Sequence, residues 1–141
     1  MEAAPHILLI HGMGSAATAW KPLTPHLLDR FNVITVDLPG HGESAFTTGQ
    51  PMDPNTLAQQ VANEVEKQFG VIEFDLVGNS WGGWIALEMA ALAPNKIKSV
   101  TALAPAGFWL ASYIQRAPGT ASIRALAKSS YTLSTTFLKY E

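Results

Sequence analysis

The sequence predicts an α/β fold: a parallel, doubly wound sheet of about four strands with flanking helices. Four short apolar segments of β character alternate along the chain with helical patterns. Such alternation calls for parallel strands joined by right-handed crossovers. A Gly-x-Ser-x-Gly pentad, Gly78 to Gly82, stands where the third strand turns into a helix. The 141 residues are enough for one domain with a sizeable core.

The first strand is expected at residues 6–10, an apolar run closed by Gly12 and Gly14. Such a run is typical of a strand covered on both faces. Four apolar residues then share one helical face: Leu23, Leu27, Leu28 and Phe31. Pro22 fits only the first turn of that helix, and Pro25 makes its start irregular.

The second strand, residues 33–37, leads into the turn-rich segment 39–44. Asp53 and Pro54 then begin the clearest helix of the chain, because aspartate is a good N-cap and proline fits the first helical position. Apolar residues recur there at every fourth position: Leu57, Val61, Val65 and Phe69. Gly70 is the expected C-terminal stop.

The third strand covers residues 74–77, a helix follows Ser80, and residues 97–104 form the fourth strand. We expect residues 1–105 to make up the core of the fold. Residues 106–141 contain no strong strand and only short helical patterns, so we expect them to begin a separate helical layer.

Composition and charge exclude several classes of function. The chain is 48% hydrophobic and 14% charged, which indicates a globular protein. The net charge of -2 gives no electrostatic reason for binding nucleic acid or an anionic membrane. There is no cysteine, no apolar run long enough for a bilayer and no signal-peptide pattern. We expect a soluble cytoplasmic protein that acts on a small molecule, without a cofactor, metal, nucleic acid or membrane.

The pentad carries the candidate chemistry. A sharp strand-to-helix turn would lift Ser80 above the end of the sheet and expose its side chain. Gly78 and Gly82 would let backbone pass close to backbone on either side of that turn. The N–H of Trp81, at the start of the helix, would face developing negative charge. If the first and third strands are neighbours, the N–H of Met13 converges on the same oxyanion.

Three segments together resemble the signatures of α/β-hydrolase fold enzymes: His11-Gly12-Met13-Gly14, Asp37-Leu38-Pro39-Gly40-His41-Gly42-Glu43-Ser44 and Gly78-Asn79-Ser80-Trp81-Gly82-Gly83. They occur in the family's order with family-like spacing, and the resemblance covers residues 6 to about 108. It implies that Ser80 is a nucleophile and that the N–H groups of Met13 and Trp81 form an oxyanion hole. It also implies that residues beyond 106 begin a helical cap.

A serine at this position argues against epoxide-hydrolase or haloalkane-dehalogenase chemistry. Hydrolysis of an ester, a thioester, a lactone or a carbon–carbon bond stays open.

The chain departs from the family in the catalytic relay, which runs serine, then aspartate or glutamate, then histidine. After Ser80 there is no histidine and no aspartate, and the only acids are Glu88 and Glu141. Glu88 lies two helical turns from Ser80 and is interpreted as a surface charge.

We therefore expect an N-terminal portion of a hydrolase that is inactive by itself. The strand pair that usually precedes the first strand and the last two strands are also expected to be absent. The fourth strand would then be an exposed edge that promotes self-association.

All four histidines precede the pentad serine. The place of His11 at a strand end favours a structural role, orienting the loop with Gly12 and Gly14, over a role as general base. His41 lies in a glycine-rich turn and fits a hydrogen-bonding role there. Asp37 ends a strand and is expected to cap the following turn.

Two other functions stay open. Gly12-Met13-Gly14-Ser15-Ala16-Ala17 fits G-x-G-x-x-A, and with Asp37 it outlines a dinucleotide-binding fingerprint. Pro22 and Pro25 count against that function, since they move the helix away from the glycines that should open it. The second is a non-catalytic binding protein on the hydrolase fold, which the missing relay would fit.

Overall fold

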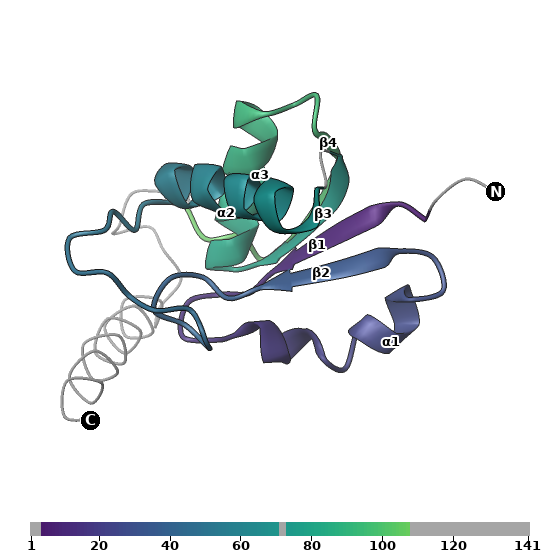
Figure 1. The fold of residues 1–141 in the computed structure, drawn as a ribbon, viewed down its shortest axis with the longest axis horizontal. Coiled ribbons are helices and arrows are strands. Elements are labelled where there is room, and N and C mark those ends of the chain that lie inside the picture. Colours follow the sequence, from purple (N-terminus) through teal and green to yellow (C-terminus); the bar gives the residue numbers. More distant parts are fainter. Residues whose placement is uncertain (1–3, 71–72, 108–141) are drawn as a thin grey trace, which may run out of the picture. The chain divides into compact units, whose positions relative to one another are not determined.

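A computed structural model describes residues 4–70 and 73–107. This part of the chain forms a four-stranded parallel sheet in the order β2-β1-β3-β4 (Figure 1). The strands are β1 His6–Ile10, β2 Asn32–Val36, β3 Phe74–Asn79 and β4 Ile97–Leu103. The predicted α/β fold with a parallel, doubly wound sheet is confirmed. The segment expected to begin a helical cap, 106–141, lies outside the described residues except for Ala106 and Gly107.

Helices cover both faces of the sheet (Figure 1). α2 (Pro54–Phe69) and α3 (Trp81–Leu92) pack on one face. A 3₁₀ helix, η1 (Ala17–Trp20), and a single turn, α1 (Thr24–Leu27), lie on the other. None of the helices in the described part of the chain combines the length and apolar character needed to cross a bilayer.

The strand β1 sits inside the sheet and is buried on both faces. Leu8 and Ile10 belong to the core beneath α2 and α3, whereas Ile7 and Leu9 belong to the smaller core around Trp20. Successive side chains of a strand point to opposite faces, so two apolar layers require an unbroken apolar run. This is why β1 shows no polar alternation.

The helix α2 begins and ends where its sequence signals stand. Asp53 accepts a hydrogen bond from the N–H of Thr56 at 2.9 Å, and Pro54 opens the helix. Gly70 adopts the left-handed conformation, with φ 64°, immediately after it. Three of the four periodic apolar residues are buried, but Phe69 is exposed because the helix ends there.

The first crossover differs from its prediction. The regular helix expected around Leu23 and Phe31 is replaced by η1 and the single turn α1. Pro22 and Pro25 lack N–H groups and cannot sit inside a regular helix, so the segment breaks into short turns. Leu27 and Phe31 still pack under the sheet, while Leu23 is exposed.

The strand order places the candidate site. β1 lies between β2 and β3, and Ile10 stands opposite Gly78 at their carboxyl ends. The chain therefore runs from β1 to β2 on one side of it, and then crosses back past β1 to form β3 on the other side. The loops after β1 and β3 meet at this reversal, where doubly wound sheets place their ligands.

Candidate active site

Ser80 forms the turn between β3 and α3 in a strained backbone conformation, with φ 54° and ψ −112°. A non-glycine residue in such a region costs about 1–3 kcal/mol and persists only where its surroundings hold it. The N–H of Ser80 donates to Leu103, and its carbonyl accepts from Trp84 and Ala106. Its side chain makes no capping hydrogen bond to α3. The backbone is thus held while the hydroxyl stays available.

Two glycines allow this turn because backbone packs directly on backbone. A Cβ on Gly78 would overlap the carbonyl of Gly82. One on Gly82 would overlap the carbonyls of Ile10 and His11. The start of α3 is therefore pressed against the ends of both β3 and β1, which the pentad pattern predicts.

The loop after β1 lies against the serine. A Cβ on Gly12 would stand 3.3 Å from both the Ser80 Cβ and the Asn79 carbonyl oxygen. Within residues 4–70 and 73–107, no hydrogen bond engages the N–H of Met13 or of Trp81. The two backbone donors expected for an oxyanion hole thus belong to segments that meet at Ser80, and both remain unused there.

His11 is buried and hydrogen bonded at both ring nitrogens. The N–H of Leu38 donates to Nε2 at 3.0 Å, so the ring proton sits on Nδ1, which donates to the Gly12 carbonyl at 2.7 Å. Burial lowers the pKa of His11 below its ordinary value of 6.5. This neutral ring has no nitrogen left to take a proton from Ser80.

His41 joins the loops after β1 and β2. The N–H of Gly14 donates to His41 Nε2 at 3.0 Å, and His41 Nδ1 donates to the Pro39 carbonyl at 3.0 Å. The His11 and His41 rings lie 5.2 Å apart, and His41 lies 6.0 Å from the Trp81 ring. His11 and His41 therefore lie side by side where the loop after β1 meets the loop after β2.

Asp37 also ties these loops together. Its Oδ1 accepts from the N–H of Ala17 at 2.6 Å and its Oδ2 from the N–H of Glu43 at 3.0 Å, the turn-capping contact expected of it. Partial burial raises the pKa of Asp37, but these two N–H groups outweigh burial and hold the pKa below its usual range. The carboxylate is ionised at neutral pH.

These features are those of a known family. A sequence profile of the family described as alpha/beta hydrolase fold matches residues 5–135. The chain belongs to the α/β-hydrolase fold family.

Several proteins are similar to this α/β-hydrolase chain. The pimeloyl-(acyl-carrier protein) methyl ester esterase of Methylococcus capsulatus is 37% identical over 99 residues, 70% of this chain and 36% of the esterase. The dihydrolipoyllysine-residue acetyltransferase component of the acetoin cleaving system of Cupriavidus necator is 34% identical over 108 residues, 74% of this chain and 28% of that protein. The crystal structure of a membrane phospholipase A, titled a bacterial virulence factor, superposes with a TM-score of 0.74 at 37% identity, covering 79% of this chain and 36% of that one. The chain thus spans between 28% and 36% of the length of these three relatives.

The contacts of this hydrolase-family chain contradict the dinucleotide-binding alternative. No helix opens on Gly14 in the described residues; the next element is η1, a 3₁₀ helix of four residues that begins at Ala17. Both oxygens of Asp37 accept backbone N–H groups, so the carboxylate serves to hold the loops after β1 and β2. Gly12 instead lets the loop approach Ser80.

The catalytic relay of the family has no counterpart in the described part of this hydrolase chain. Glu88, the one acid there that follows Ser80, accepts hydrogen bonds from Trp84 Nε1 at 3.0 Å and Asn55 Nδ2 at 3.3 Å. It therefore links α3 to α2. Glu141 lies outside the described residues. No three His, Asp or Glu side chains of residues 4–70 and 73–107 gather as a metal site.

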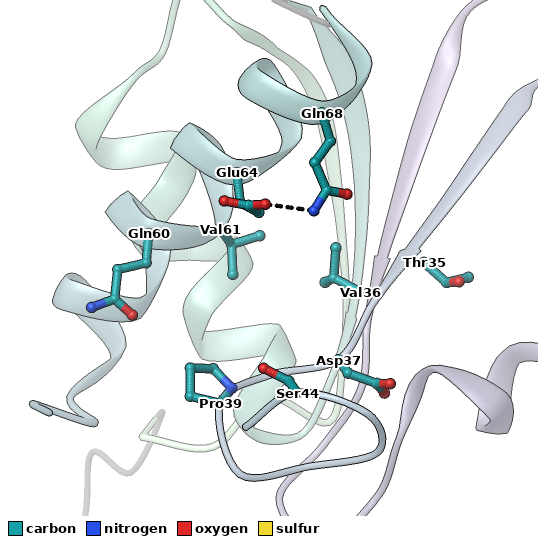
Figure 2. Close-up of a pocket in the computed structure, with 9 residues that line it drawn as sticks. All are labelled: Thr35, Val36, Asp37, Pro39, Ser44, Gln60, Val61, Glu64 and Gln68. Carbon is teal, nitrogen blue, oxygen red and sulfur yellow. Dashed lines mark hydrogen bonds between the residues drawn. The ribbon is translucent and has the colours of Figure 1, made fainter. Parts of the chain in front are cut away.

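A hollow of about 400 Å³ lies between α2 and the end of β2 (Figure 2). It is lined by Thr35, Val36, Asp37, Pro39, Ser44, Gln60, Val61, Glu64 and Gln68. The Asp37 carboxylate points away from α2, and the polar side chains Glu64 and Gln68 bond each other (Figure 2). No lining residue is a histidine or lysine that could activate Ser44 or Thr35. Ser80, the candidate nucleophile, does not line this hollow.

Sequence reasoning missed the backbone contacts from the end of β4. Leu103 and Ala106 hold the backbone of Ser80, and Ala104 between them has a positive φ of 44°. These contacts use peptide groups, which every residue carries, so no side-chain pattern marks them.

Proposed function

We propose that this chain carries the nucleophile and the oxyanion hole of a serine hydrolase acting on an ester, thioester, lactone or related carbonyl substrate. The observation that carries the proposal is the strained Ser80, with an uncapped hydroxyl, next to the unused N–H groups of Met13 and Trp81. The ester-cleaving name of the Methylococcus relative supports the substrate class.

In the proposed reaction, Ser80 Oγ attacks the substrate carbonyl carbon and gives its proton to a base. The carbonyl oxygen becomes an oxyanion, which accepts hydrogen bonds from the N–H groups of Met13 and Trp81. The tetrahedral intermediate collapses to an acyl-enzyme, and the leaving group departs with the proton that the base returns. Water, deprotonated by the same base, then attacks the acyl carbonyl, and the bond between the acyl carbon and Ser80 Oγ breaks. The acid is released, and the base returns the proton to Ser80 Oγ.

The base is proposed to come from polypeptide outside these 141 residues. Both nitrogens of His11 and of His41 are engaged, and no histidine follows Ser80. A serine hydroxyl without a base is a weak nucleophile at neutral pH. The 141-residue chain alone should therefore be inactive, whereas the complete protein should hydrolyse its substrate.

Covalent labelling with a fluorophosphonate probe tests both statements. The complete protein should be labelled, its Ser80→Ala variant should not, and hydrolysis of a short-chain nitrophenyl ester should fall on the order of 10⁴- to 10⁶-fold. Ser44→Ala, in the hollow of Figure 2, is the matched control and should keep both labelling and turnover. If Ser80→Ala kept wild-type turnover, the assignment of Ser80 as the nucleophile would be rejected. A folded complete protein without any labelling would favour a non-catalytic binding protein.

A further inference from the structure

We propose that His11 and His41 act together as positioning residues that aim the oxyanion-hole donor of Met13. The inference rests on the proposed function of this site and adds to it the groups that orient the loop. Its basis is the set of hydrogen bonds made by two neighbouring peptide groups, Gly12–Met13 and Met13–Gly14.

The Gly12–Met13 peptide is fixed through its carbonyl end. The Gly12 carbonyl accepts from His11 Nδ1 at 2.7 Å and from the N–H of Ser15 at 3.2 Å. In a trans peptide the C=O and N–H lie in one plane and point in opposite directions. Holding the Gly12 oxygen therefore sets the direction of the Met13 N–H. His11 aims this donor without touching the substrate.

The next peptide is fixed through its N–H end. The N–H of Gly14 donates to His41 Nε2 at 3.0 Å, and Gly14 adopts a positive φ of 73°. His41 is itself anchored, because its Nδ1 donates to the Pro39 carbonyl. The Met13–Gly14 peptide therefore cannot rotate without breaking its bond to His41. Met13 stands between two peptides that different imidazoles hold.

The hydrogen bonds assign the same tautomer to both rings. Each Nε2 accepts a backbone N–H, from Leu38 in His11 and from Gly14 in His41, and each Nδ1 donates to a backbone carbonyl. The charged and titratable groups that face the pair are the other imidazole, with ring centroids 5.2 Å apart, and Asp37, whose Oδ1 lies 3.9 Å from His11 Nε2.

The loss of this arrangement should appear in turnover rather than in binding. Oxyanion-hole donors grip the negative charge that develops in the transition state, so a displaced donor lowers kcat and leaves KM nearly unchanged. Removal of one such donor typically lowers kcat by about 10²- to 10³-fold. Displacement of the Met13 N–H should reach the lower part of that range.

A pair of substitutions at His41 separates positioning from bulk. The amide oxygen of His41→Gln can stand where Nε2 stood and still accept from Gly14. The amide nitrogen of His41→Asn can stand where Nδ1 stood and donate to Pro39, but that side chain leaves Gly14 without an acceptor. Both variants remove the imidazole ring. If the ring served only to fill space, the two variants would therefore change kcat and Gly14 exchange equally.

The experiment uses the complete protein and measures ester kinetics together with amide hydrogen exchange of residues 12–14. We expect His41→Asn to lower kcat about 100-fold at unchanged KM and to speed Gly14 exchange, and His41→Gln to restore most of both. Equal kcat values in the two variants, or Gly14 exchange that is the same in all three proteins, would overturn the proposal.

The exchange measurement needs no turnover. It therefore tests the His41 contact even if the complete protein proves to hydrolyse nothing, which would reject the proposed function alone. Thermal melts of both variants show whether each is folded. If His41→Asn does not fold, His41→Gln with wild-type kcat and Gly14 exchange supports the proposal, and failure of that variant in both readouts contradicts it.

Discussion

Gly12 lies directly against Ser80: a Cβ on residue 12 would stand 3.3 Å from the Cβ of the serine. This contact between Gly12 and Ser80 fixes how far the loop after β1 lies from the turn after β3. Gly12 has no side chain, so the two segments can approach closely. The distance between Ser80 and the loop that we propose to carry an oxyanion-hole donor is set at this point.

Gly12→Ala should therefore lower activity more than stability. The added methyl group would push the loop away from Ser80 by a few tenths of an ångström, and small misplacements of reacting groups are costly in rate. We expect kcat of the complete protein to fall about 10-fold, with a melting temperature within a few degrees of wild type. Unchanged kcat in a folded Gly12→Ala protein would show that the loop adapts without loss.

Gly78→Ala should destabilise the fold strongly, because its methyl group would overlap the Gly82 carbonyl, which is backbone and cannot easily move aside. We expect a loss of about 3 kcal/mol or more in the free energy of unfolding, measured by urea denaturation. Gly49→Ala is the control: Gly49 has a positive φ of 84° but open space around it. That variant should lose only about 1–2 kcal/mol. Gly78 has no positive φ, so equal losses would mean that a shift of the backbone relieves the overlap.

The stability of the fold should fall as the pH drops below 6.5. Burial lowers the pKa of His11 in the folded state, so between the folded value and 6.5 the unfolded chain binds more protons. The contribution of His11 is complete above pH 6.5 and decreases as the pH falls toward the folded pKa. Urea denaturation of wild type and His11→Gln at a series of pH values measures it. The pH dependence of the urea midpoint of His11→Gln reports the other titrating groups and is subtracted from that of wild type. A corrected wild-type midpoint that stays constant from pH 7.5 to 5 would contradict the prediction.

NADH should not bind. Gly12 lies against Ser80, no helix opens on Gly14 in the described residues, and Asp37 binds the N–H groups of Ala17 and Glu43. Titration followed by NADH fluorescence should give no saturable change, with a dinucleotide-binding dehydrogenase as positive control. Saturable binding that Asp37→Asn abolishes would restore the alternative function.

The 141-residue chain should self-associate through β4. In the part of the chain that the structure describes, this strand pairs with β3 alone, and Thr101 on it is exposed. An unpaired strand edge can accept another strand, and a lysine on the edge opposes this. Sedimentation velocity should show larger species as concentration rises, fewer in Thr101→Lys, and no change in Thr48→Lys, an exposed loop position. A wild-type monomer at every concentration would reject this interface.

The features that follow from local sequence could be predicted, and those that join distant segments could not. The apolar run of β1 and the caps of α2 mark their elements because the cause lies within a few residues. The prolines near α1 indicated an irregular start, but the extent of the break depends on packing beneath the sheet. Gly78 and Gly82 could be predicted because the turn itself demands them.

The contacts of His11 and His41 with backbone are different. Gly14 and His41 lie 27 positions apart in the chain, and the hydrogen bond between them leaves no periodic signal. The sequence indicates that histidines stand in two loops. Only the arrangement of β1 beside β2 brings those loops together and decides which nitrogen accepts.

The interior position of β1 has a consequence for synthesis. Residue 7 pairs with residue 33 on one side and residue 75 on the other, so β1 is synthesised before both of the strands that it pairs with. Until β3 emerges, the apolar run from Ile7 to Ile10 lacks one of its partners and resembles the segments that chaperones hold. A pause in translation before β3 has emerged from the ribosome would prolong that exposure, whereas a later pause would not.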